Sequence, residues 1–276
     1  MSQPYPFLDR HMLRNSAQSG KTLLNAWCAM PGTMSTEVMA FQDWDVLTVD
    51  LQHGILDYQV AVEMVRTIQG RGKPVMARIP WIDPIPAMKM LDAGVSGLIC
   101  PMVSRPEHAQ EFVSYCRYPP KGIRSFGPTR AALGDPDYAA TANDRVICAV
   151  QIEEKAAMDA LDEIAAVDGV DMLYVGPADL GLTHGMKPQM DHEASEMLAM
   201  YDKIIAACDR HNLVPAIQTV SPDYAARMHA MGFRFITIAS DLRILASATK
   251  ALIDRARSEM DTAFKAKSGN AALSAY

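Results

Sequence analysis

Eight nearly continuous apolar segments recur along the chain, and a stretch with helical spacing follows each of them. The segments comprise residues 22–30, 45–51, 74–79, 97–103, 146–153, 171–176, 213–220 and 233–239. Apolar runs without polar alternation are typical of strands that are buried on both faces of a parallel sheet. Eight β-then-α units in series, with connections long enough for parallel pairing, predict an α/β fold, the closed (β/α)8 or TIM barrel.

The segments between these strands favour helices. Several of them stop at a glycine or asparagine, as a left-handed C-terminal cap requires, namely at Gly70, Gly94, Asn212 and Gly232. A doubly wound open sheet is the alternative fold. No glycine-rich dinucleotide loop follows the first strand, which argues against it.

Two further helices flank the repeated units. We expect an N-terminal helix near Leu8–Ala17 and a long C-terminal helix that ends near Ala266, followed by a frayed tail over 267–276. The chain shows no linker and no low-complexity tract. Its 276 residues are therefore expected to form a single barrel domain.

Composition excludes several classes of partner. The chain carries 26 Lys and Arg against 32 Asp and Glu, a net charge of −6, so it lacks the basic excess that binds nucleic acid or an anionic membrane. The five cysteines are scattered and never form a CxxC pair, which fits a reducing compartment. No apolar run approaches the roughly 18 residues of a membrane span. We therefore expect a cytoplasmic protein.

In a (β/α)8 barrel the C-terminal strand ends carry the site, and polar residues interrupt four of them. Gln151 and Glu153 share one face of the fifth strand, and Asp179 follows one βα unit later. Two hard carboxylates without a nearby His or Cys suit an oxygen-ligated cation such as Mg²⁺ or Mn²⁺. The alternative is that Glu153 pairs with a lysine or arginine on the rim.

A candidate proton-transfer pair follows the second strand. His53 comes three residues after Asp50, and Gly54 predicts a turn there that brings the carboxylate back to one ring nitrogen. Such a pair fixes the imidazole tautomer and raises its basicity, so His53 is a candidate base.

Two anion-binding groups complete the pattern. Arg78 ends an apolar strand and is costly to bury unless an anion meets it, either a substrate carboxylate or enolate or a structural partner in Asp50 or Glu153. The turn at Gly176-Pro177 after the sixth strand can point backbone N–H groups into the site.

Two connections exceed the usual loop length, residues 121–143 and 182–192. Long loops at the mouth of a barrel are usually functional, and we expect both on the site side or its rim.

At these residues the chain resembles the HpcH/HpaI aldolase family of metal-dependent (class II) pyruvate aldolases. The resemblance runs from about Asn25 to Asp241 and rests on DLQHG, PVMARIP, DAGVSGLICPMV, YPPKGIRSFG and VQIEEKAAMDALDEIAAVDGVDMLYVGPADLG. It implies a (β/α)8 barrel, a homohexamer (a trimer of dimers) that exchanges the final helix between subunits, and a divalent metal. Mg²⁺ or Mn²⁺ is expected, with Co²⁺ or Zn²⁺ as alternatives.

The resemblance also implies a role for each site residue. Glu153 and Asp179 match the metal ligands, Asp50 and His53 the proton-transfer dyad, and Arg78 the arginine that touches the keto or enolate oxygen. The implied substrate-binding residues are Arg78, Gln151, Gly176, Pro177, Ala178, Asp179 and Trp27, with the amides of Ala178 and Asp179 on the substrate carboxylate. Two departures from the family pattern are Leu51-Gln52 before His53, which leaves the dyad intact, and Ser125-Phe126 after GIR, which bears on acceptor specificity.

The activity that follows is the reversible cleavage of a 4-hydroxy-2-oxoacid to pyruvate, or hydroxypyruvate, and an aldehyde through a metal-stabilised enolate. A lysine Schiff base is disfavoured because no lysine lies inside an apolar strand. The alternative enzyme is a lyase of the citrate-lyase β-subunit type that acts on a CoA thioester, and the non-enzymatic alternative is a scaffold barrel.

Overall fold

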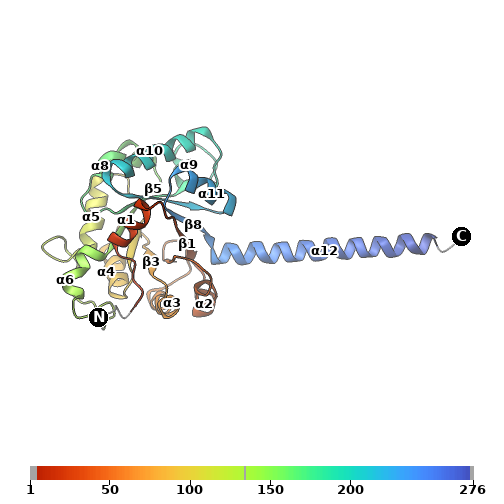
Figure 1. Ribbon diagram of the computed structural model, residues 1–276, viewed down its shortest axis with the longest axis horizontal. Coiled ribbons are helices and arrows are strands. Elements are labelled where there is room, and N and C mark those ends of the chain that lie inside the picture. Colours follow the sequence, from red (N-terminus) through yellow and green to blue (C-terminus); the bar gives the residue numbers. More distant parts are fainter. Residues whose placement is uncertain (1–4, 134, 274–276) are drawn as a thin grey trace.

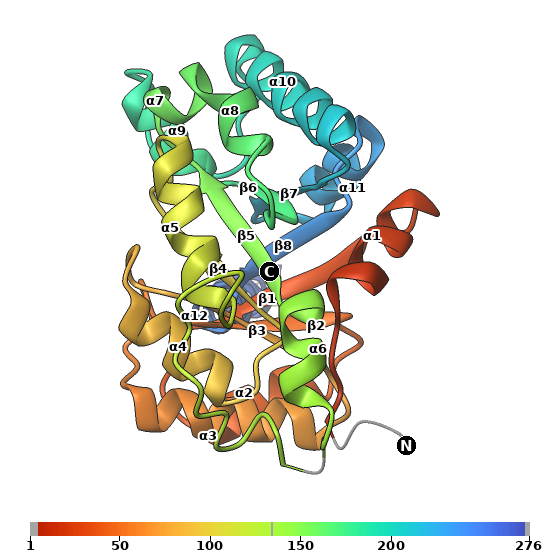
Figure 2. The same ribbon diagram turned by 90° about the vertical axis from the view of Figure 1, so that its left-hand side faces the viewer.

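The computed structural model describes residues 5–133 and 135–273, which form a closed barrel of eight parallel strands in sequence order, with β8 paired to β1 (Figures 1 and 2). The strands are β1 (Leu23–Cys28), β2 (Val46–Asp50), β3 (Val75–Arg78), β4 (Gly97–Cys100), β5 (Ile147–Ile152), β6 (Met172–Val175), β7 (Val214–Thr219) and β8 (Phe235–Ser240). The predicted barrel is confirmed. Seven strands lie within their predicted segments, and β8 ends one residue beyond its own.

Most of the helices in the described chain cover the outside of the barrel. The helices are α1 (Arg10–Gln18), α2 (Thr33–Ala40), α3 (Tyr58–Gly70), α4 (Pro84–Asp92), α5 (Pro106–Cys116), α6 (Tyr138–Arg145), α7 (Lys155–Asp159), α8 (Leu161–Ala165), α9 (Pro177–Thr183), α10 (Ser195–His211), α11 (Pro222–Met231) and α12 (Asp241–Leu273). Side-chain caps begin several of them, because Asp57, Asp83 and Ser221 each accept a backbone N–H of the first helical turn. Asn212 ends α10 in the left-handed conformation, as its position in the sequence predicts.

Two apolar layers follow from the alternation of side chains along each strand. One face of the strands packs against the helices, and the other fills the barrel interior with residues such as Met76, Ile99, Tyr174 and Phe235. The barrel interior is therefore a packed core, and the site of this fold is expected at its C-terminal mouth.

Helix α1 closes the other end of the barrel. Leu8 and Leu13 pack into the interior layer, and the fully buried Asp171 carboxylate accepts hydrogen bonds from Arg10 Nε at 2.7 Å and Arg14 Nη2 at 3.0 Å. Asp171 also accepts the backbone N–H of Cys148 at 2.9 Å. This network ties the N-terminal helix to β5 and β6, far from the mouth.

Helix α12 leaves the barrel after β8 and projects into solvent (Figure 1). It continues to Leu273, so the predicted end near Ala266 is wrong. No proline interrupts residues 267–273, and Ala271, Ala272 and Leu273 favour a helix, although Gly269 and Asn270 do not. The frayed tail over 267–276 stays a prediction, and residues 274–276 lie outside the described part.

The long connection at residues 121–143 lies at the closed end of the barrel, and the expectation that it borders the site is wrong. It follows α5 and precedes β5, and helix-to-strand connections lie opposite the mouth. Arg130 and Ala131 donate backbone hydrogen bonds to Asp92 O at the end of α4, at 3.2 and 3.0 Å, which holds the segment there.

Two chain-wide features agree with the composition. All five cysteines are buried free thiols. Within the ranges that the structure describes, no helix is both long and apolar enough to cross a bilayer.

Candidate active site

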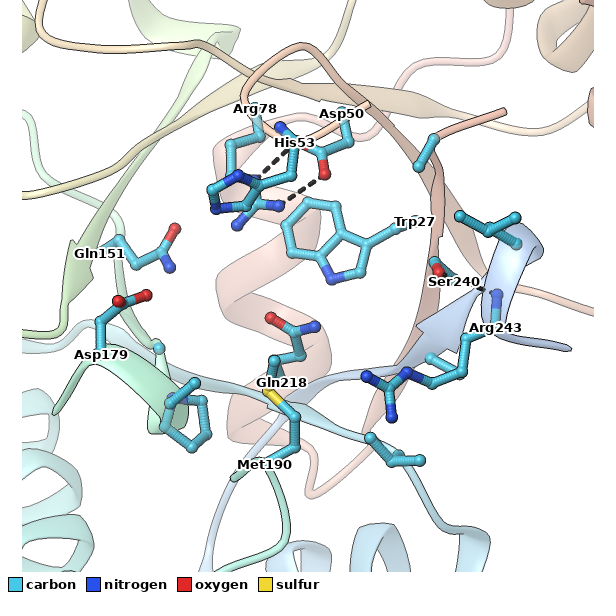
Figure 3. Close-up of a pocket in the computed structure, with 17 residues that line it drawn as sticks. Trp27, Asp50, His53, Arg78, Gln151, Asp179, Met190, Gln218, Ser240 and Arg243 are labelled. Atoms are coloured by element: carbon cyan, nitrogen blue, oxygen red, sulfur yellow. Dashed lines mark hydrogen bonds and ion pairs between the residues drawn. The ribbon is translucent and has the colours of Figure 1, made fainter. Parts of the chain in front are cut away.

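A cavity of about 260 Å³ opens at the C-terminal ends of the strands, and Figure 3 shows 17 residues that line it. Nine of the predicted site residues line this cavity: Trp27, Asp50, His53, Arg78, Gln151, Gly176, Pro177, Ala178 and Asp179. Glu153, the remaining one, is buried and in contact with the lining residue Gln151. Met190, from the 182–192 connection, also lines the cavity, so this long loop lies on the site side as predicted.

Asp50 and Arg78 form a buried, two-point ion pair. The parallel register places them side by side at the ends of β2 and β3. Arg78 Nε donates to Asp50 Oδ1 at 2.8 Å, and Nη2 donates to Oδ2 at 2.6 Å. Of the two interpretations of Arg78, the structural partner in Asp50 is therefore present in this structure, and it holds the guanidinium in one orientation.

The predicted contact between the Asp50 carboxylate and the His53 ring is not formed. The turn at Gly54 exists, with Gly54 N donating to Asp50 O at 3.1 Å. However, Asp50 Oδ1 accepts the backbone N–H of His53 at 3.3 Å, and no hydrogen bond joins it to the imidazole in the described part of the chain. Arg78 meets the carboxylate from the neighbouring strand, and the exposed His53 ring lines the same cavity (Figure 3).

The ring of Trp27 packs against the guanidinium of Arg78. The Arg78 Cζ atom lies 4.2 Å from the centre of the Trp27 ring, and the indole itself is buried against Tyr174 with ring centres 5.7 Å apart. A guanidinium over an aromatic face is attracted to the ring electrons. Arg78 is thus oriented both by a carboxylate and by an aromatic face.

Glu153 is a buried carboxylate without a cationic partner in the described residues, so the alternative of a rim ion pair is wrong. Its Oε1 accepts the backbone N–H of Met102 at 2.7 Å, and its Oε2 accepts Gln151 Nε2 at 2.5 Å. Met102 adopts the left-handed conformation at φ 57°, which is uncommon for a side-chain-bearing residue. Burial raises the pKa of Glu153 from its ordinary 4.5 to about 7, and the nearby Asp179 charge also raises it, against the two hydrogen bonds and Arg78.

Gly176 makes room for this carboxylate. A Cβ atom at Gly176 would lie 2.4 Å from Glu153 Oε2 and 2.7 Å from Gln151 Nε2. Any larger residue would displace one of the two groups. Gly176 also precedes the short helix α9, whose first turn carries Ala178 and Asp179 with backbone N–H groups that lack partners within the helix.

These residues fit a divalent cation. Glu153 and Asp179 are hard oxygen donors close enough for their charges to interact, and the buried Gln151 Oε1 has no hydrogen-bond partner in the described chain. No set of three or more His, Cys, Asp or Glu in the described residues forms a closed metal cage. A two-carboxylate site of this kind leaves coordination positions for water and for substrate oxygens.

Several lining residues were not predicted, and most of them lie in or directly after strands β7 and β8. They are Ala29, Met190, Gln218, Val220, Ala239, Ser240, Leu242 and Arg243. The sequence could have indicated Ser240, Leu242 and Arg243, because the largely polar sequence Ser240-Asp241-Leu242-Arg243 directly follows the eighth apolar segment.

The arrangement of Arg78, His53 and three carboxylates at the mouth of a (β/α)8 barrel agrees with a family match. The family model described as HpcH/HpaI aldolase/citrate lyase matches residues 26–248. The chain belongs to this family. The predicted resemblance is confirmed, and every predicted site residue falls within the matched range.

Named relatives agree with this family membership. A hydroxypyruvate/pyruvate aldolase of Rhizorhabdus wittichii is 35% identical over 246 residues, which cover 89% of this chain and 98% of the relative. A 4-hydroxy-2-oxo-heptane-1,7-dioate aldolase of Escherichia coli is 31% identical over 242 residues, with 86% and 92% covered. The crystal structure of a family protein from Burkholderia cenocepacia is similar at a TM-score of 0.82 and 27% identity, with 89% and 98% covered.

Proposed function

We propose that this protein is a metal-dependent, class II pyruvate aldolase that reversibly cleaves 4-hydroxy-2-oxoacids to pyruvate, or hydroxypyruvate, and an aldehyde. The observation that carries the proposal is the meeting of the Asp50–Arg78 pair, His53 and the Glu153 and Asp179 carboxylates at one small cavity. The family match and the aldolase names of the relatives support it.

The 2-oxoacid end of the substrate is held by α9 and Arg78. The first-turn amides of Ala178 and Asp179 bind its carboxylate, because unpaired N–H groups at a helix start attract an anion. Arg78, held by Asp50 and Trp27, donates a hydrogen bond to the keto oxygen. A divalent cation held by Glu153 and Asp179 supplies, when bound, positive charge beside the developing enolate.

His53 moves the proton. In the cleavage direction it accepts the proton of the C4 hydroxyl while the C3–C4 bond breaks and its electron pair passes into the enolate. The aldehyde then leaves, and His53 returns the proton to C3 of the enolate, which yields pyruvate. Because Asp50 pairs with Arg78 in this structure, we assign Asp50 to positioning the guanidinium, and the exposed imidazole to proton transfer.

We assign the cation as Mg²⁺ or Mn²⁺, because carboxylate oxygens are hard ligands; Co²⁺ and Zn²⁺ are the alternatives. The test is cleavage of a 4-hydroxy-2-oxoacid with pyruvate release measured after chelation and after addition of each metal. Chelation is expected to abolish activity and Mg²⁺ or Mn²⁺ to restore it. Inactivation by borohydride in the presence of pyruvate would reveal a Schiff base and refute the proposal.

A lyase that acts on a CoA thioester is the competing function. The cavity volume of about 260 Å³ lies below the roughly 300–1,000 Å³ typical of drug-sized ligands and suits a small oxoacid better than a nucleotide thioester. A measurement of CoA binding decides between the two functions, and we expect none.

We further propose that the chain forms a homo-oligomer, a hexamer built as a trimer of dimers, through α12. Over residues 241–263, where side-chain burial is described, this helix leaves six large apolar side chains exposed: Leu242, Ile244, Leu245, Leu252, Ile253 and Met260. An apolar surface of this extent on a projecting helix favours burial against another subunit. Light scattering coupled to size exclusion tests the mass, and a monomer would refute the proposal.

A further inference from the structure

Arg243 stands apart from the groups that the proposed reaction uses. It lines the cavity from the first turn of α12, and Figure 3 shows its guanidinium pointing into the cavity from the side opposite Gln151 and Asp179. Within the described part of the chain its side chain forms no ion pair or hydrogen bond. By contrast, Arg78, the other arginine of the cavity, is neutralised by a two-point pair with Asp50.

The backbone that carries Arg243 is firmly held. Asp241 is buried, and its carboxylate accepts the backbone N–H groups of Ala29 at 3.0 Å, Met30 at 3.1 Å and Leu242 at 2.8 Å. The backbone N–H of Arg243 donates to Ser240 Oγ at 3.3 Å. These bonds join the start of α12 to the end of β1, so the backbone of Arg243 has a defined position beside the cavity.

The position of Arg243 determines which part of the substrate it can meet. In the proposed function the carboxylate of the 2-oxoacid is bound at the start of α9, beside Asp179, on the far side of the cavity. The bond to be broken extends the substrate away from that point, so the group that approaches Arg243 belongs to the aldehyde half. A guanidinium without a protein anion is suited to a carboxylate, which it binds through two parallel hydrogen bonds.

We propose that Arg243 is a specificity-determining residue that selects aldehydes carrying an anionic group such as a carboxylate. The inference rests on the proposed aldolase function and adds the class of acceptor to it. It requires that Arg243 acts on the acceptor and leaves the binding and deprotonation of pyruvate unchanged.

The test compares matched acceptors with pyruvate as donor. Glyoxylate is paired with glycolaldehyde, and 4-oxobutanoate with butanal, so that each anionic aldehyde has a neutral counterpart of similar size. In Arg243→Ala we expect kcat/KM for the better anionic aldehyde to fall about tenfold. Loss of a hydrogen bond to a charged group can have a larger effect, but the Arg243 side chain is exposed, so we expect the lower end of that range. The neutral aldehydes should change less than about twofold, and Arg243→Lys should retain part of the preference.

Two controls test the role of Arg243 separately from the proposed aldolase function. Arg66→Ala removes an exposed arginine of α3 outside the cavity and should leave all four acceptors unchanged. Exchange of the pyruvate C3 protons in deuterated water should be the same in Arg243→Ala as in the unmodified protein. Raising the ionic strength should weaken the anionic preference of the unmodified protein, since an exposed ion pair is screened.

Each result has one meaning. An equal fall for anionic and neutral aldehydes, or no fall for either anionic one, overturns the role of Arg243 while the aldolase remains. If the unmodified protein forms no product with any acceptor and exchanges no C3 protons in the presence of metal, the aldolase function is refuted, and the role of Arg243 with it.

Discussion

The buried Glu153 predicts an unusual pH dependence of stability for the metal-free protein. Its pKa lies at about 7 in the folded chain and near 4.5 when the chain is unfolded, because burial disfavours the charge. Between these two values the folded state holds a proton that the unfolded state has released. The free energy of unfolding therefore falls as the pH rises from about 4.5 to 7, and this contribution is flat above that range.

The pKa difference sets the size of the effect. At ~1.4 kcal/mol for each pH unit between the two pKa values, ionising Glu153 costs the folded state about 3 kcal/mol. Glu153→Gln keeps the shape of the side chain and an oxygen to accept from Met102, but it cannot ionise. Relative to Glu153→Gln, the unmodified protein should lose about 2.5 kcal/mol of stability between pH 5 and pH 8, a window that covers most of the interval between the two pKa values.

Urea unfolding of the chelated proteins at several pH values measures this difference. Both proteins are compared at one protein concentration, since oligomer stability depends on it. If the free energies of unfolding of the unmodified protein and of Glu153→Gln changed with pH in parallel, Glu153 would not titrate in this range, and the reasoning would be refuted. Direct Mn²⁺ titration provides a second readout: the metal competes with the proton, so apparent affinity should weaken about tenfold per pH unit below 7.

Three further substitutions test the site and the closed end of the barrel. Gly176→Ala places a Cβ atom against the Glu153 carboxylate, so the affinity for Mn²⁺, measured by titration, should fall at least about tenfold. The circular dichroism spectrum should stay unchanged, and an unaltered Mn²⁺ affinity would contradict the close packing. Asp50→Asn leaves Arg78 unpaired and misplaced, and pyruvate C3 proton exchange followed by NMR should slow by about a hundredfold; exchange at the normal rate would remove the pair from the mechanism. Asp171→Asn should lower the free energy of unfolding in urea by about 3 kcal/mol while kcat/KM is kept, and a stability equal to the unmodified protein would show that the arginine network is unimportant.

Local pattern was sufficient to predict the barrel and most of the site. Each strand is short, apolar and followed by a helix, so its identity is encoded within a few residues. The polar residues at the strand ends then converge, because parallel strands of a closed sheet share one C-terminal edge. For this reason Asp50, Arg78, Glu153 and Asp179 could be placed together without knowledge of any distance.

The site residues after β8 were harder to find, although the sequence contains them. Arg243 belongs to a helix whose further course runs into solvent, and its amphipathic pattern alone does not show which residue faces the cavity. Its direction follows from the Asp241 hydrogen bonds to the end of β1, more than two hundred residues earlier in the chain.

The sequence by itself determined which residue types stand at the mouth of the barrel, because that depends on local periodicity and on the order of the units. The tertiary structure decided their partners. Asp50 is three residues from His53, yet its carboxylate binds Arg78, which the register of β2 and β3 sets beside it. Glu153 carries no mark of its raised pKa in the sequence, since burial and the closeness of Asp179 arise only when β5 and β6 pair. Electrostatic energy depends on distance and on exclusion of water, and both are properties of the folded chain.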